Sequence, residues 1–174
     1  MGASFELMPA SRLLNGLPPI IGGSPRLLIL GNMPSVMSLA GQQYYGNPRN
    51  AFWRIAGELV GFTADAPYDD RVAALIDHGI AVWDVLKSCR REGSLDSAVE
   101  RDSMVPNDFS SLHGAWPGIG RVYFNGAAAE ANYRKLVQVD RPLTYRRLPS
   151  TSPAHTMAFA AKLEAWHEIT GPRG

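Results

Sequence analysis

Cysteine is almost absent from the sequence, and histidine is sparse. Among 174 residues there is one cysteine, Cys89, so the chain cannot form an internal disulfide. The four histidines are scattered, and no cysteine or histidine has the spacing of a zinc or iron–sulfur site. We therefore expect a protein that uses no metal and no other cofactor.

Long hydrophobic runs are also missing. No stretch approaches the roughly eighteen apolar residues that mark a membrane-spanning helix. The first residues lack the basic segment, apolar segment and cleavage site of a secretory signal. These absences predict a cytoplasmic protein that does not associate with a membrane.

Neither sign of charge is in excess. The 17 basic side chains nearly balance 16 acidic ones, which argues against the tight non-specific binding to nucleic acid of strongly basic domains. A few local phosphate contacts remain compatible with this balance. A chain of this length can bury one sizeable core but not two. We expect a monomer with a single domain over residues 1–174, in which an N-terminal arm, 1–24, packs on the rest.

Short apolar runs alternate with segments of helical periodicity along the chain. The former predict strands and the latter predict helices. Their alternation indicates an α/β protein with three layers, αβα, around a central, mainly parallel four-stranded sheet. The expected strands are 26–30, 80–85, 121–124 and 143–148, and the expected helices are 51–60, 70–77, a short one from 107 or 108, 127–138, and a last one that Ser152 and Pro153 begin.

The connection between the first expected strand and the first helix is unusually long. It covers residues 31–53, mostly as loop, where two to six residues are usual. Open α/β folds bind ligands at the carboxyl ends of their strands. The strand ends near 31, 84, 125 and 149 should meet at one edge, so we expect a pocket there. The polar segment 87–103 is a second expected site loop.

Three motifs follow one another along the chain. The first is Gly31-Asn32-Met33-Pro34-Ser35, the second is QQYYGNPRNAFW at residues 42–53, and the third is LPSTSPAH at 148–155. Together they resemble the uracil-DNA glycosylase superfamily, and most closely its branch that removes hypoxanthine from deoxyinosine. The resemblance covers about residues 27–169.

This resemblance implies a monofunctional DNA glycosylase of base excision repair, with DNA containing a damaged base as its partner. Such an enzyme flips a deaminated base, most simply hypoxanthine, out of DNA and hydrolyses its N-glycosidic bond. No lysine falls in the motifs, so a Schiff-base lyase step is not indicated.

Three alternatives stay open. One is a glycosylase of the same fold that acts on uracil or on G/T mismatches. Another is a non-catalytic nucleic-acid-binding or nucleotide-binding module. The last is a serine hydrolase that uses Ser152 and His155, although the G-x-S-x-G motif is missing.

Asn50 is the residue that the resemblance assigns to catalysis. Its amide both donates and accepts hydrogen bonds, which suits it to positioning the attacking water. Many branches of the superfamily carry the water-positioning Asn or Asp in the first motif, where this chain has Met33. A thioether cannot orient a water as an amide does. The alternative role of Asn50 is to cap the following helix, and Asn32 is the alternative for catalysis.

The resemblance also places base contacts in the first two motifs. Tyr45 stands where related enzymes stack an aromatic ring on the flipped base. The main-chain amides of Gly31, Asn32 and Met33 are expected to receive a base oxygen. Asp84, at the end of the second strand, is expected to accept the N1–H of hypoxanthine, unless it caps the next segment.

The third motif is expected to contact phosphate or the leaving base. Ser150 and Ser152 offer hydroxyls near a helix start, which suits a phosphate. Leu148 stands where the family often has a histidine in this motif, and His155 is the candidate for the function of that histidine. Ala154 stands where some relatives carry a bulky wedge, so any intercalating side chain must come from elsewhere. Asn125 is expected to form a turn, with a pocket role as the alternative.

Overall fold

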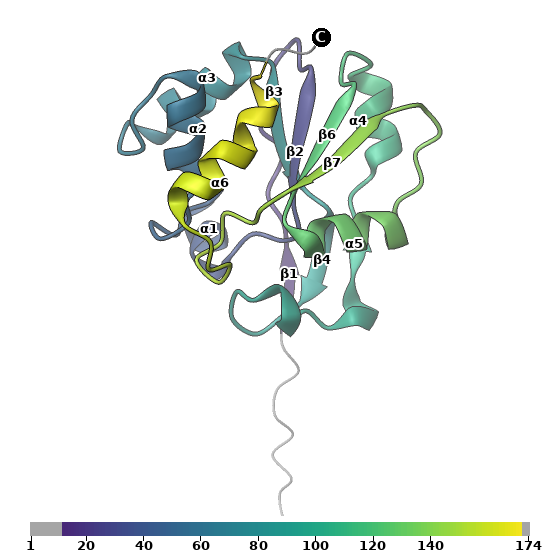
Figure 1. Ribbon diagram of the computed structural model, residues 1–174. Coiled ribbons are helices and arrows are strands. Elements are labelled where there is room, and N and C mark those ends of the chain that lie inside the picture. Colours follow the sequence, from purple (N-terminus) through teal and green to yellow (C-terminus); the bar gives the residue numbers. More distant parts are fainter. Residues whose placement is uncertain (1–11, 172–174) are drawn as a thin grey trace, which may run out of the picture.

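A sheet of four parallel strands forms the centre of the computed structural model, which describes residues 12–171. The strands are β2 (Leu27–Gly31), β3 (Ile80–Asp84), β6 (Arg121–Asn125) and β7 (Thr144–Leu148). They lie in the order β3-β2-β6-β7 (Figure 1). All four match their predicted bounds to within one residue, because short apolar runs between breakers mark buried strands clearly.

Helices cover both faces of this sheet (Figure 1). Leu27 and Ile29 belong to the core under one set of helices, whereas Leu28 and Leu30 belong to the core under the other. The predicted three-layer α/β fold is therefore confirmed. In the stretch 12–171 no helix combines the length and the apolar character that crossing a membrane requires. One face carries α2 (Phe52–Val60), α3 (Tyr68–Asp77) and α6 (Phe159–Trp166), and the other carries α4 (Phe109–Ala115) and α5 (Ala127–Leu136).

The structure contains a second sheet, three-stranded and antiparallel, that was not predicted from the sequence. It consists of β1 (Leu13–Asn15), β4 (Leu86–Arg90) and β5 (Val105–Pro106), in the order β1-β4-β5. The strand β4 lies in the segment that was expected to be a loop. Its residues mix buried Cys89 with exposed Lys87, so neither an apolar run nor clean alternation marks it. Two 3₁₀ turns follow, η1 (Asp96–Ala98) and η2 (Arg101–Ser103).

Part of the N-terminal arm contacts the main sheet. Ile20 exchanges backbone hydrogen bonds of 2.8 and 2.9 Å with Val82 of β3. Leu17 and Ile20 are buried in the core. Residues 1–11 of the expected arm lie outside the described residues.

Two helices begin away from their predicted first residues. The last helix, α6, begins at Phe159 and not at Ser152, because Ser152 closes a turn. Its Oγ accepts the N–H of Ala154 at 3.1 Å, and its carbonyl accepts the N–H of His155 at 3.0 Å. A hydroxyl residue before proline suits such a turn as well as a helix start. The helix α3 begins at Tyr68, two residues before the predicted Asp70.

The long segment 31–53 contains a short helix, α1 (Val36–Gly41), that was not expected. Ser35 caps it by accepting the N–H of Ser38 at 3.1 Å. It ends at Gln42, whose φ of 53° is left-handed. Six residues are too few for helical periodicity to be recognised in the sequence.

Candidate active site

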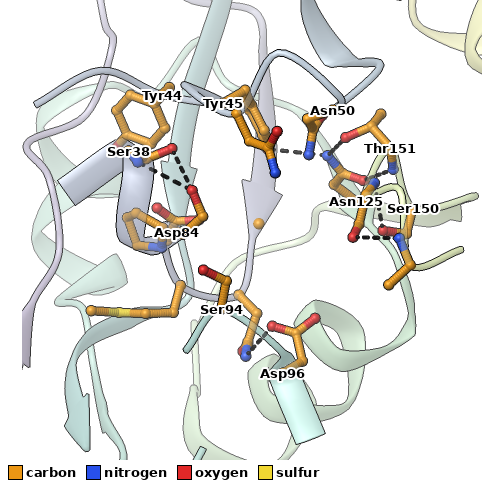
Figure 2. A pocket seen from close by; sticks show the side chains of 18 of the residues that line it. Ser38, Tyr44, Tyr45, Asn50, Asp84, Ser94, Asp96, Asn125, Ser150 and Thr151 are labelled. Atoms are coloured by element: carbon orange, nitrogen blue, oxygen red, sulfur yellow. Dashed lines mark hydrogen bonds between the residues drawn. The ribbon is translucent and has the colours of Figure 1, made fainter. Parts of the chain in front are cut away.

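A cavity of about 240 Å³ lies at the carboxyl ends of the sheet strands. Gly31, Asp84 and Asn125 are the last residues of three of these strands, and all three line it. Figure 2 shows Ser94 and Asp96 on the side of the pocket away from Tyr45. The lining includes every residue that the sequence suggested except His155, namely Gly31, Asn32, Met33, Tyr45, Asn50, Asp84, Ser150 and Ser152.

The carboxyl group of Asp84 is buried and incompletely paired. Asp84 is 5% exposed, and its Oδ2 has no hydrogen-bond partner among residues 12–171. Burial raises the pKa of Asp84 to about 7; the charge of Asp96 adds to this rise, and the guanidinium of Arg91 opposes it. Near neutral pH the group therefore exists both as acid and as carboxylate. The described residues show no cap from Asp84 to the next segment, which was the alternative role.

Gly31 allows the close approach of Asp84. The register of β2 and β3 places these two residues side by side. A Cβ on residue 31 would lie 2.5 Å from Asp84 Oδ1 and 3.3 Å from the hydroxyl of Tyr45. The first distance is shorter than van der Waals contact permits, so a side chain here would displace the carboxyl group.

Tyr45 forms one wall of the cavity. Its ring stacks on Phe52, with 4.0 Å between centroids and 26° between planes. Its hydroxyl accepts a hydrogen bond from Asn125 Nδ2 at 3.1 Å. The backbone of Tyr45 has a φ of 52°, a conformation that is rare for a bulky residue. Strain of this kind persists where surrounding contacts enforce it, as the two contacts of this ring do. Tyr44 also lines the cavity, but it is buried in the core, where its hydroxyl donates to the carbonyl of Pro18 at 2.9 Å.

Asn50 lines the cavity immediately before α2. Its Oδ1 accepts the N–H of Phe52 at 2.9 Å, but the N-cap position of α2 is Ala51, which makes no side-chain capping bond. Asn50 therefore stands one residue before the cap position that was its alternative role. An amide carries two lone pairs on oxygen and two N–H groups. The bond from Phe52 therefore fixes the orientation of the amide and leaves it further positions for hydrogen bonds. This bond and the positioning of a water are compatible at this residue.

Asn32, the alternative for catalysis, belongs to a chain of hydrogen-bonded side chains. Asn132 of α5 donates to Asn32 Oδ1 at 2.8 Å, and Asn32 Nδ2 donates to Asp96 Oδ1 at 3.1 Å. Both ends of the buried amide are thus engaged in joining α5 to the loops around the cavity. This geometry suits Asn32 to holding the loops better than to orienting a water. Met33 is buried in the core on the α4 and α5 side.

Asn125 has a larger place in the cavity than the sequence suggested. Its Nδ2 donates to Thr151 Oγ1 at 2.9 Å as well as to Tyr45, and its Oδ1 accepts the N–H of Thr151 at 2.9 Å. Asn125 therefore ties the end of β6 to the third motif and to the aromatic wall. The available signal was its position at a strand end, where Asp84 also stands. Gly126 follows with a φ of 96°, and a Cβ there would lie 2.9 Å from that of Ser150.

The third motif forms a turn beside the cavity. Ser150 Oγ accepts the N–H of Ser152 at 3.1 Å, and both residues line the cavity. Lys162 of α6 donates its Nζ to the carbonyl of Ser152 at 3.2 Å, so a cation that the sequence prediction missed lies at this turn. His155 is exposed and does not line the cavity. No hydrogen bond between the Ser152 and His155 side chains is present in the part of the chain that the structure describes, so a serine hydrolase pair is not formed.

The polar groups of the cavity are chiefly amides, hydroxyls and carboxyls. Between residues 12 and 171, no three His, Cys, Asp or Glu side chains are grouped as metal ligands. An uncharged ligand with N–H and C=O groups along its edge suits this set of donors and acceptors. A nucleobase is such a ligand.

Comparison with known proteins identifies the family. A curated hypoxanthine DNA glycosylase of Methanosarcina acetivorans is 36% identical to this chain over 157 residues, which cover 88% of the chain and 96% of the relative. The chain belongs to the hypoxanthine DNA glycosylase family. Another member of this family, from Methanosarcina barkeri, is 33% identical over 156 residues, with 88% and 95% coverage. The resemblance that the three motifs indicated is confirmed, and with it the expectation of a DNA glycosylase.

A solved structure extends this likeness to the fold of the family. The solution NMR structure of a Methanosarcina acetivorans protein, described as a candidate uracil DNA glycosylase, matches with a TM-score of 0.73 at 32% identity. The match covers 92% of this chain and all of that one. No protein-family model matches the chain.

Proposed function

We propose that this protein is a monofunctional DNA glycosylase of base excision repair that flips hypoxanthine out of deoxyinosine-containing DNA and hydrolyses its N-glycosidic bond. One observation carries the proposal. A single cavity holds Asn50, oriented by the start of α2, and the buried carboxyl of Asp84, whose Oδ2 has no partner among the described residues. Both curated relatives bear the name hypoxanthine DNA glycosylase.

Hydrolysis at this site needs positioning and electrostatics rather than covalent catalysis. Positive charge develops on the sugar and negative charge on the departing base, so fixed donors toward the base lower the barrier. Asn50 positions the water that attacks the sugar carbon. Tyr45 stacks on the flipped base, a contact that typically contributes roughly 1 to 3 kcal/mol. The main-chain amides of Gly31, Asn32 and Met33 receive the base oxygen.

Asp84 distinguishes a deaminated purine from a normal one. As a carboxylate it accepts the N1–H of hypoxanthine, whereas adenine presents a lone pair at N1 and is repelled. The N3–H of uracil meets the same requirement, so uracil is the second candidate base. The similarity to the candidate uracil DNA glycosylase also supports it.

The third motif binds phosphate beside the flipped nucleotide. Ser150 and Ser152 supply hydroxyls, and Lys162 supplies a nearby positive charge. His155, exposed next to this turn, contacts the DNA outside the cavity. In this proposal the protein acts as a monomer. A DNA substrate is in keeping with the expected cytoplasmic location.

Base release from defined DNA tests this proposal. Matched duplexes carry a single deoxyinosine, uracil, thymine opposite guanine, or normal adenine, and the wild type is compared with Asn50→Ala and Asn50→Ser. Serine retains an oxygen that can accept the N–H of Phe52 but lacks the amide. We expect hypoxanthine release to fall at least about a hundredfold in both variants, which corresponds to roughly 2.7 kcal/mol of barrier.

Asn15→Ala is the matched control, because Asn15 is exposed in β1 and does not line the cavity. Circular dichroism verifies the fold of each variant. Undiminished release in Asn50→Ser would keep the enzyme class and remove the assignment of Asn50. If uracil is released in preference to hypoxanthine, the substrate base in the proposal is wrong and the enzyme class stands. If DNA is bound but no base is released, the protein is a non-catalytic nucleic-acid-binding module.

A further inference from the structure

Large apolar side chains are exposed at the cavity and beside it. Leu95 is 57% exposed and also lines the cavity. Val36 and Met37, at the start of α1, are 50% and 51% exposed. The N–H of Val36 donates to Ser94 Oγ at 2.9 Å, so the start of α1 lies next to the segment that carries Leu95. We call Val36, Met37 and Leu95 the apolar rim.

The backbone on both sides of Leu95 is firmly held. Arg91 is 4% exposed, and its guanidinium donates to the carbonyls of Gly93 and Pro34, each at 2.7 Å. On the other side, Asp96 accepts the hydrogen bond from Asn32 at 3.1 Å. The carbonyl of Leu95 itself accepts the N–H of Ala98 at 3.0 Å. These bonds hold a large apolar side chain at the surface, where water solvates it unfavourably, rather than letting it turn inward.

We propose that Leu95 inserts into the base stack of duplex DNA and fills the space that the flipped nucleotide leaves, with Val36 and Met37 against the neighbouring sugar and base. This inference rests on the proposed function. A base enters the cavity only by leaving its stack, so a side chain that both lines the cavity and projects into solvent lies where the vacated space begins. Apolar wedges of this kind stabilise unstacked DNA.

The loop of the third motif offers no equivalent wedge among its described residues. Ala154 also lines the cavity, but a single methyl group is too short to occupy the space of a base. Met157, further along the same loop, is 41% exposed and does not line the cavity. Among the described residues that line the cavity, Leu95 is thus the one large apolar residue that is exposed.

Release of hypoxanthine from duplex and from single-stranded DNA of the same sequence separates insertion from chemistry. In Leu95→Ala, the rate on duplex should fall at least about tenfold, or about 1.4 kcal/mol of barrier, while the rate on the single strand stays unchanged. Leu95→Met should restore the duplex rate, because methionine again fills the gap. Met157→Ala is the matched control and should leave both rates unchanged. An unchanged ratio of the two rates in Leu95→Ala, or an equal loss on both substrates, would overturn the proposal.

A binding measurement keeps this test independent of the proposed chemistry. A 2-aminopurine placed beside the deoxyinosine fluoresces when its stacking is disturbed. Binding of the wild type should raise this fluorescence, and binding of Leu95→Ala should not. If the wild type releases no base but raises the fluorescence through Leu95, the proposed function fails and the insertion stands. If both proteins raise it equally, the insertion fails whatever the catalytic result.

Discussion

Two polar side chains stand at equivalent strand ends, and their surroundings differ sharply. Asn125, at the end of β6, makes three hydrogen bonds to Tyr45 and Thr151. Asp84, at the end of β3, has an Oδ2 without a partner in residues 12–171, and burial raises its pKa to about 7. A buried polar group without a partner costs stability. The comparison indicates that Asn125 holds the wall of the cavity, whereas Asp84 is left for a ligand.

The largest expected effect comes from removing the charge of Asp84 in Asp84→Asn. The folded pKa of about 7 lies above the ordinary value of 3.8, so the native state retains a proton that the unfolded state has lost. Stability is therefore lost as pH rises from about 4 to about 7. This loss amounts to at most about 4 kcal/mol at pH 8. We expect Asp84→Asn to be more stable than the wild type at pH 8 but not at pH 4 in urea unfolding.

The same variant should also change the enzymatic pH profile. The rate of hypoxanthine release by the wild type should rise as Asp84 ionises near pH 7, and Asp84→Asn should lose this dependence and part of the discrimination against adenine. Asp102→Asn, at an exposed position of η2, is the control and should behave as the wild type. A stability difference between Asp84→Asn and the wild type that is identical at pH 4 and pH 8 would contradict the comparison.

Asn125→Ala should have the opposite effect on stability. It removes three hydrogen bonds and leaves the N–H of Thr151, a residue that is 1% exposed, without its acceptor. Such a loss typically costs about 2 to 3 kcal/mol. We expect this decrease at pH 4 and at pH 8 alike, with Asn15→Ala as an unaffected control. A stable Asn125→Ala protein that is merely inactive would show that Asn125 serves the ligand rather than the wall.

The smallest expected effect is that of Gly31→Ala. The new Cβ would meet Asp84 Oδ1 at 2.5 Å and push the carboxyl group aside, at a cost of about 1 to 2 kcal/mol. We expect a reduced rate of base release and a small drop in the urea midpoint. Gly41→Ala is the control, because no atom of the described residues outside its chain neighbours and its own helix backbone lies within 4 Å of the corresponding Cβ. Equal behaviour of the two variants would mean that the close approach of Asp84 to Gly31 has no role.

Individual elements show why part of the structure was predictable. The apolar run Leu27–Leu30 predicts β2, because a buried parallel strand is apolar on both faces. The strand β4 carries no such signature, because it pairs with β1 and β5 from other parts of the chain, and α1 is too short for helical periodicity to be recognised. Ser152 looks like a helix cap in sequence, yet it closes a turn, and α6 starts seven residues later. Local preference there was compatible with both outcomes.

The candidate site also has features that were predictable from the sequence and features that were not. The three motifs were sufficient to indicate the family and to select residues of which all but His155 line one cavity. The pocket role of Asn125, the engagement of Asn32 by Asn132 and Asp96, and the position of Lys162 were not derivable. The first two depend on hydrogen bonds between residues far apart in the chain, and the third depends on how the segment between Ser152 and Lys162 folds back. The residue type determines which hydrogen bonds a side chain can make, and packing determines which of them it does make.

The sequence by itself determined the order along the chain of the four parallel strands and of the helices that cover them, the edge of the sheet where loops gather, and the chemical groups brought there. It did so because apolar periodicity and breaker residues act locally. Only the tertiary structure decided that Asp84 is buried with a carboxyl oxygen unpaired among residues 12–171, that Asn125 makes three hydrogen bonds to Tyr45 and Thr151, and that Leu95 is held at the surface. Burial, pKa and pairing depend on what other segments place around a side chain, and no local pattern encodes that environment.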